Sequence, residues 1–509
     1  MSALGRDIYR RKLERNLGRS LDEPMIAAMS AISAYQAGGK PPYQLLPDFP
    51  REAIGAELGS PYYIPPWSME TLVNELLATR KRPGLGTGQT RVLRHDRFAV
   101  FQLLLSNLID LENAEDGLYL QKHDVLYEMA RIAQRQFHWQ RGVANAPNLY
   151  RSMFLYGSGS AAEFFAEDAG ISVAQLVKVG AYFSGAFTRG AVIDRDRDLS
   201  ELGITLEQRN AALARFSLEI ATARKSAAAM RAGRRHTAYR PSLLRGYPIL
   251  AFGPDGERLI APIPELVMYR YTSGLYLDVV RGGAGVWTDI GRRFEQYVHD
   301  YLTAMMAPYH VSRETTYGPK KASFRTPDVL ISAEGGTVVA AIECKAKRMT
   351  FEARFGDDPV LEASMGFDEM AKGIYQLWRF FAHARIGIAG TPSVAPDCQG
   401  ILVTADSWLA MALKQAVDVL QAANALADAE GSIEPEDRRD IAFCQIDDVE
   451  FALQNGSGTS FLDGCREIAS GEKKGWMLLV AHAAQKDVVR SYPFTDRLGE
   501  LLPWFAAGK

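Results

Sequence analysis

The sequence predicts a chain of mixed α+β and α/β class, in which a helical N-terminal region precedes a mixed β-sheet flanked by helices. Apolar residues recur at helical spacing through the first half, and two short apolar runs surround a Gly-Pro-Asp-Gly turn at 253–256. After residue 290, strand-like runs alternate with helical ones. A chain of 509 residues is too long for one hydrophobic core. We therefore expect a helical region at 1–245, a hairpin and connector at 246–284, and an α/β domain at 285–509.

The composition is that of a globular protein, with 47% hydrophobic and 23% charged residues. The net charge of -2 means that any nucleic-acid surface must be a local basic patch. The four cysteines are widely separated, which favours buried thiols over a zinc site or disulfides. No run of roughly 18 apolar residues and no secretory signal is present. We therefore expect a cytoplasmic protein without a membrane partner.

Region 1–245 is predicted to be mostly helical, because apolar residues recur at helical spacing at 69–81, 97–113 and 123–137. Such a region could sense a signal, position a substrate or form a homodimer, and the sequence leaves these roles open. It also leaves open a further protein partner or trigger.

The segment 164–183 resembles a helix-turn-helix DNA-binding motif in the offsets of its small and apolar residues. Ser172 with Gln175 also fits a capping box, in which two side chains cap the start of a helix. Thr205 with Gln208 repeats that pattern in the same chain. We therefore favour two simple helix starts over a DNA-binding motif.

The C-terminal part is predicted to alternate helices and strands: helix 291–307, strand 327–331, strand 337–347, helix 362–384, strand 399–404, helix 407–428 and strand 440–446. A turn at 334–336 separates the first two strands and makes them an antiparallel hairpin. Strands that are joined through a helix pair in parallel. The result is a mixed sheet, preceded in the chain by a separate hairpin at 247–262.

Charged residues interrupt the apolar strand at 337–347. Glu343 and Lys345 are two residues apart, so both side chains leave the same face of the strand. Ionised groups in a buried strand cost free energy unless they are paired or bind a metal. Asp328, on the adjacent antiparallel strand, adds a second carboxylate, and a divalent cation would relieve the repulsion between the two. An ordinary ion pair on an exposed strand is the alternative, which the apolar neighbours disfavour.

The order Pro327-Asp328, hairpin, Glu343-Cys344-Lys345 resembles the signature of the PD-(D/E)xK, or restriction-endonuclease-like, nuclease superfamily over about 285–450. The resemblance implies a restriction-endonuclease-like sheet and a nuclease domain at 285–509. It implies that Asp328 and Glu343 hold Mg²⁺, for which Mn²⁺ can substitute, with help from the backbone carbonyl of Cys344. It further implies that Lys345 orients or activates the attacking water and stabilises charge on the phosphate.

Two flanking residues agree with this resemblance. Glu295 lies on the helix before the motif, where many members of the superfamily carry an acidic residue that faces the metal. Gln376 lies on the first helix after it, where RecB-like nucleases place a glutamine, although Phe380 stands where they usually carry a tyrosine. We therefore add Glu295 and Gln376 to the catalytic set and Glu295 to the metal ligands. Surface positions on the two helices are the alternative.

The strongest basic segment lies between Arg224 and Arg245, which has no acidic residue. We predict that it binds phosphates through four arginines, Arg231, Arg234, Arg235 and Arg240. Lys347 continues the alternation from Lys345 and is a further candidate for phosphate binding. A solvated helix face is the alternative for the arginines.

The sequence thus predicts a Mg²⁺-dependent endonuclease that hydrolyses DNA, with RNA left open as a substrate. By its architecture it is similar to bacterial defence or restriction effectors. One alternative is a catalytically inactive nuclease-like protein that binds nucleic acid, which the intact Asp, Glu and Lys set disfavours. The other is a helical scaffold with an α/β interaction domain, which would gain no stability from Mg²⁺ or Mn²⁺.

Overall fold

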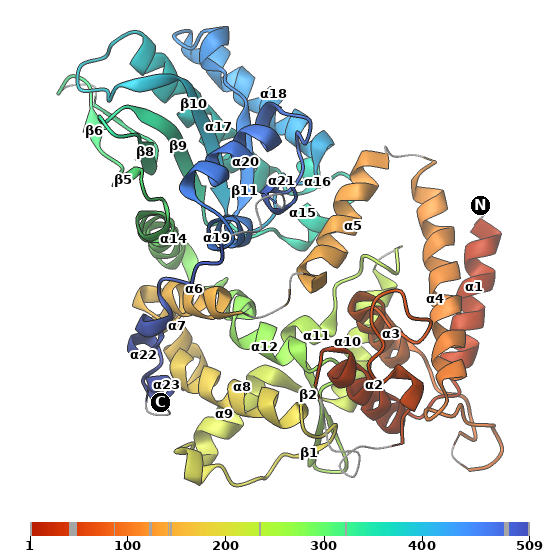
Figure 1. Ribbon diagram of the computed structural model, residues 1–509. Coiled ribbons are helices and arrows are strands. Elements are labelled where there is room, and N and C mark those ends of the chain that lie inside the picture. The colour runs from red at the N-terminus through yellow and green to blue at the C-terminus, as the bar shows by residue number, and fades with distance from the viewer. Residues whose placement is uncertain are drawn as a thin grey trace. The chain divides into compact units, whose positions relative to one another are not determined.

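A computed structural model of the chain describes residues 3–39, 48–85, 87–121, 125–140, 142, 145–233, 236–320, 323–482 and 488–506. The chain divides into two compact units (Figure 1). Unit 1 comprises 1–123, 135–145 and 156–281, and unit 2 comprises 124–134, 146–155 and 282–509. Helix α5 (Val125–Gln140) belongs in part to each unit, and α6 (Ala146–Tyr156) belongs almost wholly to unit 2.

Unit 1 is built mainly of helices, as the sequence predicts: α1 (Ala3–Leu17), α2 (Asp22–Gln36), α3 (Pro66–Ala78), α4 (Phe98–Tyr119), α7 (Gly159–Ala169), α8 (Val173–Phe187), α9 (Leu206–Phe216), α10 (Ile220–Ala232), α11 (Leu243–Gly246), α12 (Glu265–Tyr271) and α13 (Tyr276–Val279). Short 3₁₀ turns occur at Arg51–Ala53, Ser200–Leu202 and Ser273–Leu275. Helix α1 packs on α4, and α3 packs on α10. Buried side chains from these helices form one hydrophobic core.

A small sheet completes unit 1, with the strand order β1-β4-β3-β2. The predicted hairpin is confirmed as β3 (Ile249–Phe252) and β4 (Arg258–Ile260), which pair antiparallel. It is joined by β1 (Ile193–Asp194) and β2 (Ser217–Glu219). The sequence did not indicate these last two strands, because two or three residues are too few to show an alternating pattern. The segment expected to be a connector at 246–284 therefore lies almost entirely within unit 1.

Both predicted capping boxes are present. The Ser172 hydroxyl accepts a hydrogen bond from the Gln175 N–H, and the Gln175 side chain accepts one from the Ser172 N–H. Thr205 and Gln208 repeat this reciprocal arrangement at the start of α9. The two sequence patterns are therefore explained by helix starts.

Unit 2 contains a five-stranded sheet with the order β11-β10-β9-β8-β5. Its strands are β5 (His310–Arg313), β8 (Val329–Ser332), β9 (Val338–Lys345), β10 (Val394–Thr404) and β11 (Ile441–Gln445). Strands β5, β8 and β9 pair antiparallel, whereas β9, β10 and β11 pair parallel, so the predicted mixed sheet is present. A separate two-stranded ribbon is formed by β6 (Thr316–Tyr317) and β7 (Phe324–Arg325).

The helices from residue 283 onward are α14 (Gly283–Met305), α15 (Phe351–Phe355), α16 (Pro359–Glu362), α17 (Ser364–Arg385), α18 (Leu413–Glu430), α19 (Ile446–Gln454), α20 (Gly458–Ser470), α21 (Leu478–His482), α22 (Leu498–Leu501) and α23 (Pro503–Ala506). Two 3₁₀ turns lie at Pro435–Asp437 and Thr495–Arg497. Helix α17 packs on β9 and β10, α14 on β5, β8 and β9, and α20 on β10 and β11.

The central strand β9 is buried on both faces. Ala340, Ala341 and Ile342 are all fully buried, and successive side chains of a strand point to opposite faces. This burial explains the uninterrupted apolar run in the sequence. All four cysteines are buried free thiols, as predicted. Among the described residues, no helix combines the length and apolar character needed to cross a bilayer.

Candidate active site

The charged residues of the sequence motif meet at one edge of the five-stranded sheet. Strands β8 and β9 are antiparallel, and Val329 pairs with Ile342. Asp328, just before Val329, and Glu343, just after Ile342, therefore stand beside each other at the start of β8 and the end of β9. Lys345 follows two residues later, so its side chain leaves the same face of β9 as that of Glu343.

Glu343 and Lys345 form a close ion pair that α17 covers. Lys345 Nζ donates hydrogen bonds to Glu343 Oε1 at 2.7 Å and to Gln376 Oε1 at 3.3 Å. Glu343 is only 3% exposed, so its carboxylate has little access to bulk water. The structure thus brings Gln376, which lies on the helix after the motif, to the ammonium of Lys345.

Asp328 is held by the backbone of the neighbouring strand. The Cys344 N–H donates a hydrogen bond of 2.7 Å to Asp328 Oδ2. Within an antiparallel pair, the N–H and C=O of one residue point toward the same neighbouring strand. The Cys344 carbonyl is therefore directed toward the side on which Asp328 lies.

Three carboxylates at this edge have raised pKa values. Burial, with the adjacent negative charge of Asp328, raises the pKa of Glu343 to about 8, although Lys345 opposes this shift. Burial also raises the pKa of Glu295 to about 7, and the charges of Asp328 and Glu314 add to it. The pKa of Asp328 is raised chiefly by burial, against the hydrogen bond from Cys344.

Lys345 is the main cation that faces this negative charge. Burial alone would lower its pKa, but the Glu343 and Asp328 carboxylates outweigh burial and the pKa is raised. Lys345 therefore remains a charged ammonium at neutral pH. One ammonium balances one of the carboxylates, which leaves the site with a preference for further positive charge.

The donor set fits a hard divalent cation. Asp328 and Glu343 supply carboxylate oxygens and Cys344 a backbone carbonyl, and Mg²⁺ binds through one or two carboxylates while it keeps several waters. Within the described ranges, no group of three or more His, Cys, Asp and Glu side chains is arranged to hold a metal. Glu295 would accordingly act near such an ion through its charge or through water.

Two residues that the sequence did not single out belong to this site. The Glu314 N–H donates to the Asp328 carbonyl at 3.0 Å, and its charge raises the pKa of Asp328 and Glu295. Gly373 lies on α17 against the ion pair, where an added Cβ would stand 3.0 Å from Lys345 Cε and 3.3 Å from Glu343 Cγ. A glycine three residues before Gln376 was the only signal of this close approach.

Lys347 and the following segment are fixed by carboxylates of unit 2. Lys347 Nζ donates to Glu369 Oε1 at 2.9 Å. Asp406 accepts hydrogen bonds from Arg348 and Arg354. Burial alone would raise the pKa of Asp406, but these two arginines outweigh it and lower the pKa to about 2. The chain after β9 is thereby anchored to the loop that follows β10.

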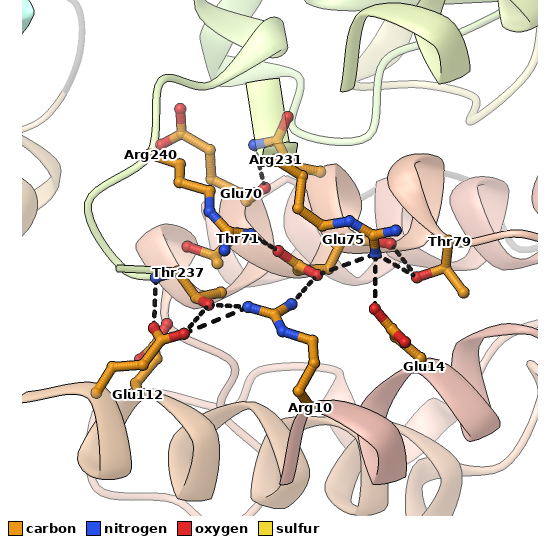
Figure 2. Close-up of polar contacts among 12 residues, drawn as sticks. Arg10, Glu14, Glu70, Thr71, Glu75, Thr79, Glu112, Arg231, Thr237 and Arg240 are labelled. Carbon is orange, nitrogen blue, oxygen red and sulfur yellow. Dashed lines mark hydrogen bonds and ion pairs between the residues drawn. The ribbon is translucent and has the colours of Figure 1, made fainter. Parts of the chain in front are cut away.

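Two of the four predicted phosphate-binding arginines of unit 1, Arg231 and Arg240, have carboxylate partners (Figure 2). Arg240 Nη1 donates to Glu75 Oε1, and Arg231 Nη1 lies 3.3 Å from Glu14 and 3.7 Å from Glu75. The exposed fraction is 25% for the Arg231 side chain and 10% for that of Arg240. These two arginines therefore do not form the open basic surface that the sequence suggested.

Two other arginines of that segment, Arg224 and Arg245, are also paired with carboxylates. Arg224 donates to Asp22 at 2.7 Å, and Arg245 forms two hydrogen bonds with Glu70. Arg234 and Arg235, two further predicted phosphate ligands, lie outside the described residues. The acidic partners come from α1, α2 and α3, far away in the sequence, so the local segment looked unbalanced.

Comparison of the chain with protein-family models, with curated proteins and with solved structures gives no match. The interpretation of the site therefore depends on the positions and charges of Asp328, Glu343, Lys345, Glu295 and Gln376, and on the order of the sequence motif.

Proposed function

We propose that unit 2 is a metal-dependent nuclease that hydrolyses phosphodiester bonds, with DNA as its substrate. The observation that supports this most strongly is the buried Glu343–Lys345 pair beside Asp328, with two carboxylate pKa values raised to about 8 and about 7. Such an excess of buried carboxylates costs stability unless a cation relieves it. Perturbed pKa values of this kind concentrate at functional sites.

Each residue has a definite part in the proposed reaction. Asp328, Glu343 and the Cys344 carbonyl would hold Mg²⁺ or Mn²⁺, with Glu295 nearby. A divalent ion bound there would supply Lewis-acid activation of the phosphate and a lowered water pKa. Lys345 Nζ is held between Glu343 and Gln376, so it can donate a hydrogen bond to the attacking water or to a phosphate oxygen.

The reaction proposed is attack of water on phosphorus with departure of the 3′ oxygen, which leaves 5′-phosphate and 3′-hydroxyl ends. We further propose that unit 2 has a restriction-endonuclease-like fold and that the chain, by its architecture, has a role in bacterial defence or restriction. RNA is the second substrate to be tested, because the proposed roles of the site residues involve the phosphate, which DNA and RNA share, rather than the sugar.

The test is cleavage of supercoiled, linear and single-stranded DNA, and of RNA, in Mg²⁺ or Mn²⁺. Asp328→Ala and Lys345→Ala should abolish cutting. Asp440→Ala and Lys474→Ala are the matched controls, because this exposed pair lies just before β11, at the opposite end of the parallel strands from Lys345. Cutting by the two site variants at the wild-type rate would refute the assignment.

Metal binding is a second, independent readout. Mn²⁺ should raise the melting temperature of the wild type and have little effect on Asp328→Ala. A scaffold with an α/β interaction domain has no reason to respond to Mn²⁺. Absence of any metal effect on the wild type, together with no cleavage, would favour that alternative.

A further inference from the structure

A two-stranded ribbon leaves the sheet at the same edge as the candidate site and packs against α17 through Tyr317 and His383. Arg313, the last residue of β5, pairs with Val329, which directly follows Asp328. The chain then forms β6 and β7, in which Thr316 pairs with Arg325, and returns through Pro327 to Asp328. Ribbon and site are therefore joined by only a few residues of backbone.

Arg325 presents its positive charge at this ribbon. Its side chain is 75% exposed and forms one salt bridge, to Glu314 at 3.2 Å. Its charge counteracts the rise in the pKa of Glu295, which burial and Asp328 produce, so Arg325 lies within electrostatic range of the carboxylates. An exposed salt bridge of this kind is weak, and the guanidinium can exchange Glu314 for another anion.

A second arginine, Arg379, stands beside the ribbon on α17. Its guanidinium lies 5.8 Å from the ring centre of Phe324 and 5.3 Å from that of Tyr375. Arg379 follows Gln376 by three residues, so both lie on one face of the helix. Gln376 therefore contacts Lys345, while Arg379, on the same face of α17, contacts Phe324 of the ribbon.

We propose that Arg325 and Arg379 bind the phosphate backbone of the nucleic acid on one side of the scissile bond. This surface replaces the predicted one in unit 1, whose described arginines are occupied by glutamates and aspartates. The proposal rests on the proposed nuclease function and adds the residues that hold the substrate.

The need for such residues follows from the charge of the site. Glu295, Glu314, Asp328 and Glu343 would repel a polyanion, and Lys345 is already paired with Glu343. Guanidinium groups match phosphate oxygens in geometry and retain their charge at every working pH. The aromatic rings of Phe324 and Tyr375 hold Arg379 in place by cation–π contact.

The experiment measures fluorescence anisotropy of a labelled DNA duplex, a DNA single strand and an RNA strand with the full-length protein in EDTA, over a series of KCl concentrations. Arg325→Ala and Arg379→Ala should each weaken binding by roughly five- to tenfold. Each should also reduce the slope of the logarithm of the binding constant against the logarithm of the KCl concentration by about one, because one fewer phosphate is neutralised. Arg325→Lys should keep the salt dependence, since it keeps the charge. Lys474→Ala, an exposed cation with a single carboxylate partner, is the control and should bind as the wild type does.

The outcomes separate this proposal from the nuclease function. If the wild type cuts DNA but both arginine variants bind with unchanged affinity and salt dependence, the phosphate surface is refuted and the nuclease stands. If the wild type binds, loses affinity on substitution, but never cuts, the surface stands and the catalytic proposal falls. A wild type that binds none of the three probes overturns both.

Discussion

Two clusters of buried charge, one in each unit, differ in their balance. In unit 1, Arg10, Arg231 and Arg240 surround Glu75, so cations face the carboxylate from several sides (Figure 2). In unit 2, Glu295, Asp328 and Glu343 are gathered around Lys345. In the first arrangement several cations face one carboxylate, whereas in the second three carboxylates share one ammonium.

This difference separates a structural role from a functional one. Both oxygens of Glu75 accept hydrogen bonds from arginines, and both oxygens of Glu115 accept from Thr237. Such a network of paired charges fixes the helices that carry it. Glu343 instead forms its ion pair through Oε1 with Lys345 while its pKa rises to about 8. An arrangement that lowers the stability of the protein is expected where a ligand or a reaction requires it.

The largest change in stability should come from the balanced cluster. Glu75→Ala leaves three arginines facing a buried gap, and breaking a buried ion pair by removal of one partner costs about 3–5 kcal/mol. Urea unfolding followed by circular dichroism would measure the loss. Glu369→Ala, which removes an exposed partner of Lys347, is the control and should cost less than about 1 kcal/mol. Equal effects of the two substitutions would show that the cluster of unit 1 does not hold its helices together.

The unbalanced cluster should respond in the opposite way. Glu343→Gln replaces a carboxyl group whose ionisation is opposed by burial, Asp328 and Glu295, so the melting temperature in EDTA should stay the same or rise. Cleavage should fall about a hundredfold or more, because a metal ligand is lost. Both quantities can be measured on one preparation. A variant that melts much earlier yet cuts normally would reverse the roles assigned to the two clusters.

The pH dependence of stability should also distinguish the clusters. The folded protein holds a proton on Glu343 up to about pH 8, whereas the unfolded chain loses it near 4.5. The stability that this group contributes is therefore complete below 4.5 and is lost as the pH rises through about 8. Melting temperatures in EDTA should fall over this range, and the fall should be smaller for Glu343→Gln.

A bound divalent metal ion should restore the stability that the protein loses at alkaline pH. Binding requires ionised carboxylates, so Mn²⁺ should stabilise the protein more at about pH 8.5 than at about pH 6. An equal shift at both values would mean that Glu343 is not a ligand. The Glu75→Ala variant should show the same pH dependence of stabilisation by Mn²⁺ as the wild type, since that substitution lies in the other unit.

The order of elements in unit 2 could be predicted from the sequence because each is long enough to show its period. The predicted strand 337–347 and helix 362–384 correspond to β9 and α17 within a few residues. The helix predicted at 407–428 begins later, at Leu413, because Asp406 and Trp408 hold the preceding residues in a loop. In the site, the spacing of Glu343 and Lys345 was sufficient to place both side chains on one face.

What the sequence did not reveal depends on contacts between distant segments. The run from Arg224 to Arg245 looked like an open basic surface, but Glu14, Glu70 and Glu75 come from α1 and α3 to pair with its arginines. Conversely, Arg325 was not singled out from the sequence, and only the pairing of β5 with β8 places it near the site. The local sequence therefore identified the residue types that form the site, but it did not show which basic residues are exposed.

The smallest expected effect concerns Gly373, which lets α17 approach the ion pair. An alanine there would place its Cβ 2.9 Å from Leu402 Cδ1 and 3.0 Å from Lys345 Cε. Relief of this overlap would displace Lys345 from Glu343 and Gln376, so the cleavage rate should fall about tenfold. Stability should change by less than about 1 kcal/mol, because the better helix propensity of alanine offsets the overlap.

Gly185→Ala is the matched control for that substitution, since Gly185 lies within α8 and an added Cβ would meet nothing within 4 Å. It should stabilise unit 1 by up to about 1 kcal/mol and leave cleavage unchanged. If Gly373→Ala also gains stability without loss of rate, the side chain of Lys345 has room to adjust. The position of its ammonium would then be set by Glu343 and Gln376 alone, and the close approach of α17 would serve packing rather than catalysis.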